Sequence, residues 1–453
     1  MLSLIREGLH VRQRWVVWAL VGIGWLLLFS DTLTIREANL DDVQFQRVVN
    51  DGQMWNYITM WGPAQGRYYG VFAFSPIWLL DSLRSPWLYQ IVRLGLVATS
   101  LWFLGILLMR VTHSPELNLL WWLLWIGCLQ IPPVFYALLS YPQMNCGLIF
   151  VLLAALSFWR ALESPNAVVP WISGMLYFIG LQFNEAFLAF TFLFLFLKWQ
   201  QSNRPGFVRS WRVVVPIGSA VILYLCIYSI YRCLYRNSIH YEGTQTGSNI
   251  QGALLYMIRY GASSLPGFEL VIDRDPAHSA FRSLHEIIQR LSTVDFLRIP
   301  WALAVGAAAS WLGYTAQWTR SFRQSAVLCS GLGITGLLFL SVPAVSAKYQ
   351  VFAYHRLYPH AYNFILVHFM WASIAVAVFG IMTLFRSSAK NRKVIAIGFG
   401  FVIGTICLIA QTTNRLALDE IRQTVGRRGP LKTLNTLNSE RWVRTGSLIL
   451  FTY

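Results

Sequence analysis

Long apolar runs separated by short polar segments dominate the chain. Runs of spanning length lie near residues 15–30, 67–83, 86–110, 119–141, 143–162, 171–198, 213–234, 301–318, 326–342, 362–385 and 394–411. A helix rising 1.5 Å per residue crosses a hydrocarbon core of about 30 Å with runs of this kind. We therefore predict an all-α fold: a polytopic transmembrane bundle of about eleven spans, forming one integral membrane domain over residues 1–453. The run at 67–83 is short for a span, and the run at 171–198 is long.

Composition supports a membrane protein. The chain has 453 residues, of which 56% are hydrophobic and only 12% charged, too little charge for the surface of a soluble protein of this length. The net charge of +17 raises nucleic acid as a partner. We exclude it because the Lys and Arg residues fall mainly in short loops between apolar runs, where they set orientation and hold anionic headgroups. The expected partner is the lipid bilayer.

The basic loops predict how the chain is oriented. An N-terminus on the cytoplasmic side places four basic segments inside, as the positive-inside rule requires: the N-terminus with Arg6, Arg12 and Arg14, then Lys198–Arg212, Arg320–Arg323 and Arg386–Lys393. The first run lacks a small-residue cleavage site, so we interpret it as an uncleaved span. An odd number of spans puts the C-terminal tail, 412–453, outside, although that tail is itself basic.

Three outside segments are then long enough to carry chemistry: 31–66, 234–300 and 343–361. Binding and catalytic residues are common on loops held by a rigid scaffold. The second segment contains a candidate surface helix, Ala280–Leu291, with apolar residues at helical spacing. The six cysteines form no CxxC pair, so neither a zinc site nor a disulfide framework is predicted.

Two adjacent carboxylates, Asp41 and Asp42, follow the first span. Such a pair can divide two tasks, one carboxylate accepting a proton from an attacking hydroxyl while the other orients it or holds a cation. The alternative is structural: a solvated pair capping a helix that begins near Val43, since Asp is a favourable N-cap residue.

One apolar helix, an acidic pair at the start of a long outside loop and many further spans resemble the GT-C class of glycosyltransferases. The segments LDDVQF and GRYYGVFAFSPIWLLD resemble in particular the bacterial O-antigen-modifying glucosyltransferases. The resemblance implies a sugar donor linked to polyprenyl phosphate, a glycan or lipid acceptor, and a location in the inner (cytoplasmic) membrane with the active site on the periplasmic side. It implies Asp41 or Asp42 as the catalytic base.

The donor would leave as a lipid phosphate, so cations are expected near its headgroup. The predicted phosphate-binding residues are Arg67, Lys348, His355 and Arg356, and the predicted substrate-binding residues are Gln44, Gln65, Tyr68, Tyr69, Tyr354, His360 and Glu185. Structural alternatives stay open: Arg67 snorkelling to the interface, residues 343–361 forming an interfacial belt, and Glu185 as a neutral carboxyl that orients helices within the membrane.

No cofactor is predicted with certainty. His355 and His360 are five residues apart, which separates them on a helix, so no metal site is predicted; a divalent cation, Mg²⁺ or Mn²⁺, stays open. No Gly-rich nucleotide loop is present, so a lipid-linked donor is favoured over a nucleotide sugar. The rival hypotheses are an O-antigen or polysaccharide polymerase dependent on loop arginines, a transporter or flippase of lipid-linked glycans, and a membrane acyltransferase.

Overall fold

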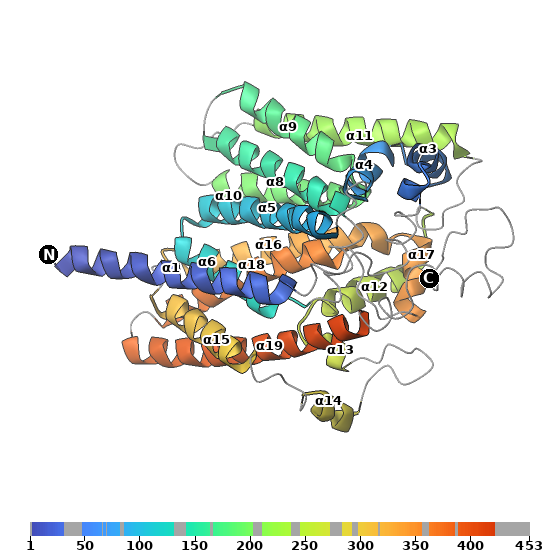
Figure 1. The fold of residues 1–453 in the computed structure, drawn as a ribbon. Helices are drawn as coiled ribbons and strands as arrows, with labels where there is room; N and C mark the ends of the chain where they lie inside the picture. The colour runs from blue at the N-terminus through green and yellow to red at the C-terminus, as the bar shows by residue number, and fades with distance from the viewer. Residues whose placement is uncertain are drawn as a thin grey trace.

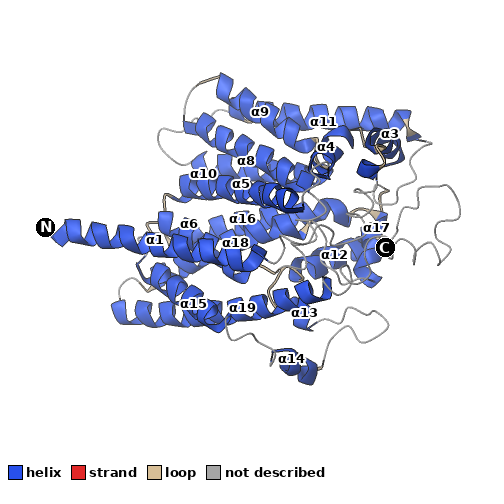
Figure 2. Cartoon of the chain, viewed as in Figure 1, coloured by secondary structure: helices blue, strands red, loops and turns tan. Residues whose placement is uncertain are grey.

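The computed structural model describes residues 2–30, 48–65, 67–68, 70–81, 86–130, 142–163, 166–202, 211–236, 245–271, 283–291, 298–315, 318–355, 362–385 and 388–421. Throughout these ranges the regular elements are helices (Figure 2). One bridge between extended residues is found in the described ranges, and it joins Thr246 and Ser346. The all-α prediction is therefore confirmed for the described part of the chain.

Long helices lie side by side in one bundle (Figure 1). They are α1 (Leu2–Phe29), α5 (Pro86–Thr112), α8 (Pro142–Glu163), α11 (Val215–Leu234), α15 (Arg298–Thr315), α16 (Phe322–Ala344), α18 (Asn363–Leu384) and α19 (Ala389–Ile421). Six stretches of the described residues are long and apolar enough to cross a membrane: 87–112, 142–163, 211–234, 322–344, 363–384 and 389–416. They coincide with six of the predicted runs.

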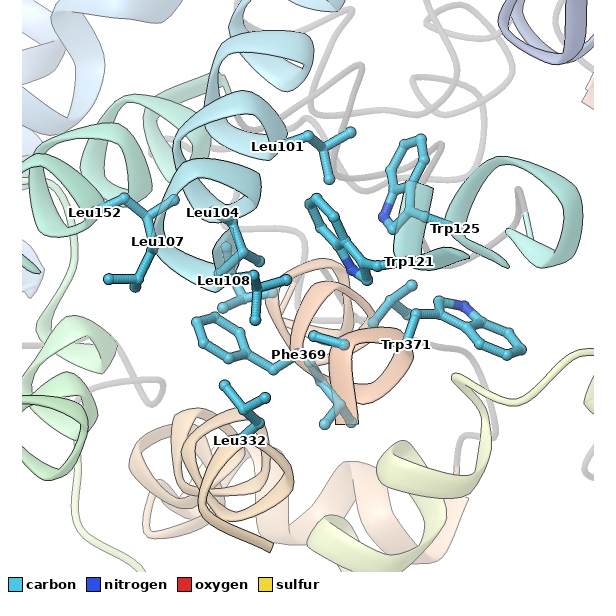
Figure 3. Packing of buried hydrophobic residues seen from close by; sticks show 14 of the residues in the cluster. Leu101, Leu104, Leu107, Leu108, Trp121, Trp125, Leu152, Leu332, Phe369 and Trp371 are labelled. Atoms are coloured by element: carbon cyan, nitrogen blue, oxygen red, sulfur yellow. The ribbon is translucent and has the colours of Figure 1, made fainter. Parts of the chain in front are cut away.

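The helix α6 (Pro115–Cys128) forms the centre of the bundle. Every residue from Leu117 to Cys128 is buried, and the helix contacts α1, α5, α15, α18 and α19. Trp121 and Trp125 pack beside Phe369 and Trp371 of α18 (Figure 3). The outer helices instead expose large apolar side chains, among them Trp102, Ile222 and Phe401. An apolar surface of this kind suits lipid and not water.

The run at 67–83 does not form a helix of spanning length. Its helix α4 (Gly70–Asp81) has 12 residues, about 18 Å at the helical rise, well short of a hydrocarbon core of about 30 Å. It packs against α3 (Met54–Gln65), and the pair share a small core that includes Met54, Tyr57, Ile58 and Ile77. Our expectation of a single span here is not confirmed, since the described residues form a helical pair at one end of the bundle (Figure 1).

The run at 171–198 is also not one helix. It folds back between α9 (Val168–Leu181) and the 3₁₀ helix η2 (Glu185–Phe190), which continues into α10 (Thr191–Ser202). The Tyr177 hydroxyl of α9 donates to the Phe187 carbonyl at 3.0 Å and lies 2.9 Å from the Thr191 hydroxyl. Since these contacts join the two arms of a hairpin, Glu185 lies at a turn between helices and not midway along one span.

Basic residues gather at one end of the bundle, which we call the basic end. There Arg14 pairs with Glu116 at the start of α6, Arg320 donates to the Val111 carbonyl near the end of α5, and the Arg392 guanidinium lies 5.7 Å from the Tyr314 ring centroid. Their common end agrees with the orientation that the positive-inside rule predicts.

The opposite end, which we call the loop end, holds α4 and helices of the predicted outside segments: α3, α12 (Ile250–Ala262), α13 (Phe268–Val271) and α17 (Ala347–His355) (Figure 1). Within the expected surface helix at 280–291 the structure has α14 (Leu284–Leu291), with Leu284 and Ile288 exposed. The tail expected from residue 412 begins later, because α19 continues to Ile421 and buries Thr412, Thr413 and Asn414.

Candidate functional site

A salt bridge between Arg67 and Glu185 is the centre of the candidate site. It joins the turn between α3 and α4 to the first residue of η2, across 118 positions of sequence. The side chains are only 16% and 17% exposed, so the pair is largely removed from water and its Coulomb attraction is less screened than at a surface. The sequence proposed both residues as ligands, but it gave no signal that they pair.

Local sequence explains why Glu185 is presented at this turn. The Asn184 side chain accepts a hydrogen bond from the Ala186 amide at 2.9 Å and so caps η2. Asn is a favourable N-cap residue, and a carboxylate in the first turn is favoured by the positive end of the helix dipole. Within the turn, the Gln182 side-chain amide donates to the Phe178 carbonyl at 2.9 Å. The polar triplet Gln182, Asn184 and Glu185 therefore forms a capped turn.

Tyrosines from α11 contact Tyr68 and interact with the pair. Tyr68 lies 6.0 Å from the Tyr224 ring and 6.2 Å from the Tyr231 ring, measured between centroids. The Tyr228 hydroxyl interacts electrostatically with both Glu185 and Arg67 and accepts a hydrogen bond from Arg232 at 3.2 Å. Burial raises the pKa of Tyr68 to about 12, against the lowering effect of the Gln182 side chain. Its phenol thus stays protonated at neutral pH and keeps a hydrogen to donate.

A second group of residues holds α17, which carries Lys348, against α12. The Gln350 side chain accepts from the Asn249 amide at 3.2 Å and donates to the Ala344 carbonyl at 3.1 Å. Tyr349 packs 5.7 Å from Tyr256 and 5.9 Å from Tyr362. The second and third outside segments are thus joined, and the partly buried Lys348 is carried by this joined unit.

Several predicted site residues are not placed. Asp41, Asp42, Gln44, Tyr69, Arg356 and His360 lie outside the described residues. Gln65 lies at the end of α3, and Tyr354 and His355 lie in the last turn of α17, but the positions of their side chains are not described. The proposed roles of these residues remain predictions.

Residues 31–47, which carry Asp41 and Asp42, lie outside the described residues, but the residues before and after them are described. Before them, the Phe29 ring of α1 lies 6.5 Å from Trp125, near the end of α6. After them, Val48 and Val49 pack on the core shared by α3 and α4. The described residues on either side of this segment therefore pack on the end of α6 and on the α3–α4 core.

Sequence reasoning missed Gln182, Tyr228 and Arg232. A signal existed for two of them: Tyr224, Tyr228, Tyr231 and Arg232 recur at intervals of one helical turn along α11, which predicts one polar stripe on an otherwise apolar helix. For metal binding, the described residues contain no group of three or more His, Cys, Asp and Glu side chains that could hold an ion. No family model, no curated protein and no solved structure matches this chain.

Proposed function

We propose that the chain is a membrane glycosyltransferase that moves a sugar from a polyprenyl-phosphate donor to a glycan or lipid acceptor of the cell envelope, at the face of the membrane opposite the N-terminus. The observation that supports it most is the largely buried Arg67–Glu185 pair at the loop end. Arg67 would supply a cation for the phosphate, while Asp41 or Asp42, which follow the first span in the sequence, would supply the base for proton transfer.

The reaction requires two kinds of group. A carboxylate, Asp41 or Asp42, takes the proton of the acceptor hydroxyl while its oxygen attacks the anomeric carbon of the sugar. The bond between that carbon and the phosphate oxygen breaks, and polyprenyl phosphate leaves with the bonding electrons. Guanidinium and ammonium groups stabilise the charge that develops on the phosphate.

Arg67 suits the second task because Glu185 holds its side chain in place before substrate arrives. A preformed cation in a site of low water content stabilises developing charge more than a mobile one at the surface. Glu185 would act as a positioning residue for Arg67, and Tyr68 would offer a neutral phenol to a sugar or phosphate oxygen. Lys348 on α17 would add a second cation from the third outside segment.

The test is sugar transfer from a polyprenyl-phosphate donor, followed in membranes that contain Asp41→Asn or Asp42→Asn. We expect one variant to lose activity by a factor of at least about 100, the usual contribution of a general base, while its amount in the membrane is unchanged. Full activity in both variants would remove the proposed base. Loss of activity only on replacing Arg67 would favour the polymerase hypothesis instead.

A further inference from the structure

Arg93, in the second turn of α5, is the most deeply buried cation among the described residues. Its side chain is 1% exposed. Its Nη1 donates to the Tyr89 hydroxyl at 2.9 Å, and its guanidinium carbon lies 4.8 Å from the centroid of the Tyr89 ring. Tyr89, one turn earlier on the same helix, therefore fixes the plane of the guanidinium group.

The other edge of this guanidinium is unused. Neither Nε nor Nη2 has a hydrogen-bond partner, although both atoms are inaccessible to water, and no ion pair joins Arg93 to a described carboxylate. A buried charge without a counter-ion is strongly unfavourable, and an ionisable residue within an apolar helix indicates a functional site by default. The Nε–Nη2 edge is a planar fork of N–H donors, matching two oxygens of one phosphate or carboxylate.

Packing places Arg93 at the loop end. The helices α5 and α6 form an antiparallel hairpin, in which Gly105 faces Asn118 and Trp121, so the start of α5 lies beyond the end of α6. The start of α8 lies at this end too, because Gly147 packs on Phe183 and Phe187 beside the α9–η2 turn. Near the start of α8, Gln143 Oε1 and Asn145 Oδ1 are buried without a hydrogen-bond partner.

We propose that Arg93, oriented by Tyr89, is an anion-binding residue that takes the phosphate group of a lipid between the starts of α5 and α8. The phosphate accepts two hydrogen bonds from Nε and Nη2. Hydroxyl groups carried on the same lipid, such as those of a sugar, donate to the free oxygens of Gln143 and Asn145. This assignment rests on the proposed function for the identity of the lipid, a polyprenyl-phosphate sugar, and it adds Arg93 to the cations that bind the phosphate of that lipid.

The experiment measures binding and not transfer. The full chain is purified in detergent, and its dissociation constant for polyprenyl phosphate is compared between the natural protein, Arg93→Met and Arg110→Met. Arg110 is a matched control because it lies near the other end of α5 and is exposed. We expect Arg93→Met to weaken binding by about tenfold or more, the loss of a bidentate charged contact, and Arg110→Met to leave it unchanged.

Three further ligands identify which part of the lipid Arg93 recognises. Polyprenol, which lacks the phosphate, should bind the natural protein and Arg93→Met equally. Inorganic phosphate or phosphatidylglycerol vesicles that bind with the same dependence on Arg93 would show that the site takes phosphate from those sources. Equal affinity of the natural protein and Arg93→Met for every phosphate compound would overturn the proposal.

Thermal unfolding without ligand separates binding from a structural role. Replacing an unpaired buried charge by an apolar side chain of similar length is neutral or stabilising, so the unfolding midpoint of Arg93→Met should not fall. A sharp fall together with unchanged binding would make Arg93 structural and contradict the assignment. If Arg93→Met does not fold, Arg93→Lys keeps the charge and loses the fork; affinity equal to that of the natural protein would then overturn the proposal. Full activity in both aspartate variants would refute the proposed base and leave the binding result intact.

Discussion

Among the described residues, an Arg–Glu salt bridge lies at each end of the bundle, and the two pairs differ in exposure. At the basic end Arg14 and Glu116 have side chains 41% and 18% exposed, whereas at the loop end Arg67 and Glu185 are 16% and 17% exposed. In the first pair, Glu116 also accepts a hydrogen bond from the hydroxyl of Ser114, the N-cap residue of α6. The second pair lies near tyrosines of α11. An Arg–Glu salt bridge is therefore partly exposed to solvent at the basic end, whereas at the loop end the same kind of pair is largely buried.

The largest expected difference concerns the two glutamates. Glu185→Gln leaves Arg67 partly buried without its counter-ion, which costs about 3 kcal/mol of unfolding free energy. Reversible unfolding in mixed micelles of denaturing and mild detergent gives this value. If Glu185→Gln costs no more unfolding free energy than Glu116→Gln at the basic end, the two salt bridges are equivalent.

A substitution of Gln350 tests the contact between α12 and α17, which joins the second and third predicted outside segments. Gln350→Ala removes its bonds to Asn249, Gly247 and Ala344, so we expect a loss of about 2 kcal/mol and faster hydrogen exchange of backbone amides at 245–255. The control is Gln324→Ala, which removes a glutamine from the exposed capping box of α16 at the basic end and should cost about 0.5 kcal/mol. Equal exchange rates in the two variants would show that Gln350 does not hold this contact.

Tyr177 tests how firmly the α9–η2 turn presents Glu185. Tyr177→Phe keeps the ring and removes the hydroxyl that reaches Phe187, Leu188 and Thr191, so we expect a loss of about 1 kcal/mol. Tyr314→Phe, at a partly exposed position of the basic end, is the control and should be nearly neutral. A neutral Tyr177→Phe would mean that the apolar contacts of the hairpin hold the turn without this hydroxyl.

The smallest effect is expected for Glu116→Gln at the basic end. Because Arg14 is substantially exposed, the pair contributes about 0.5 kcal/mol, and raising the salt concentration should reduce even this difference. Unfolding at low and at high salt measures it. A salt-independent loss comparable to that of Glu185→Gln would remove the distinction between the ends.

The fold was predictable where the apolar pattern was unambiguous. Six runs became helices of spanning length because their apolar composition is high and charged residues within them are few. The pattern failed at 171–198, where hydropathy alone cannot separate one long helix from two short ones. A local signal separates the two possibilities. Asn184 followed by Glu185 is typical of a helix start, so it indicates a turn between two short helices at this position.

The candidate site was predictable only in its parts. Arg67 and Glu185 each stood out as polar groups in apolar surroundings, but no local pattern links residues separated by 118 positions. The sequence also did not predict the burial of Arg93, which depends on how α5 packs against its neighbours. Ion pairs between helices and the burial of single charged residues depend on how the helices pack, and no local sequence pattern reports this packing.

The enclosed helix α6 has a consequence for how the protein responds to bilayer thickness. Its 14 residues span about 21 Å, which in contact with lipid would force the bilayer to thin. Protein surrounds α6 on all sides, so no hydrophobic mismatch arises there, and only the outer helices need to match the acyl chains. The central column, with the buried tryptophans that support the loop end, is thereby insulated from changes in lipid composition.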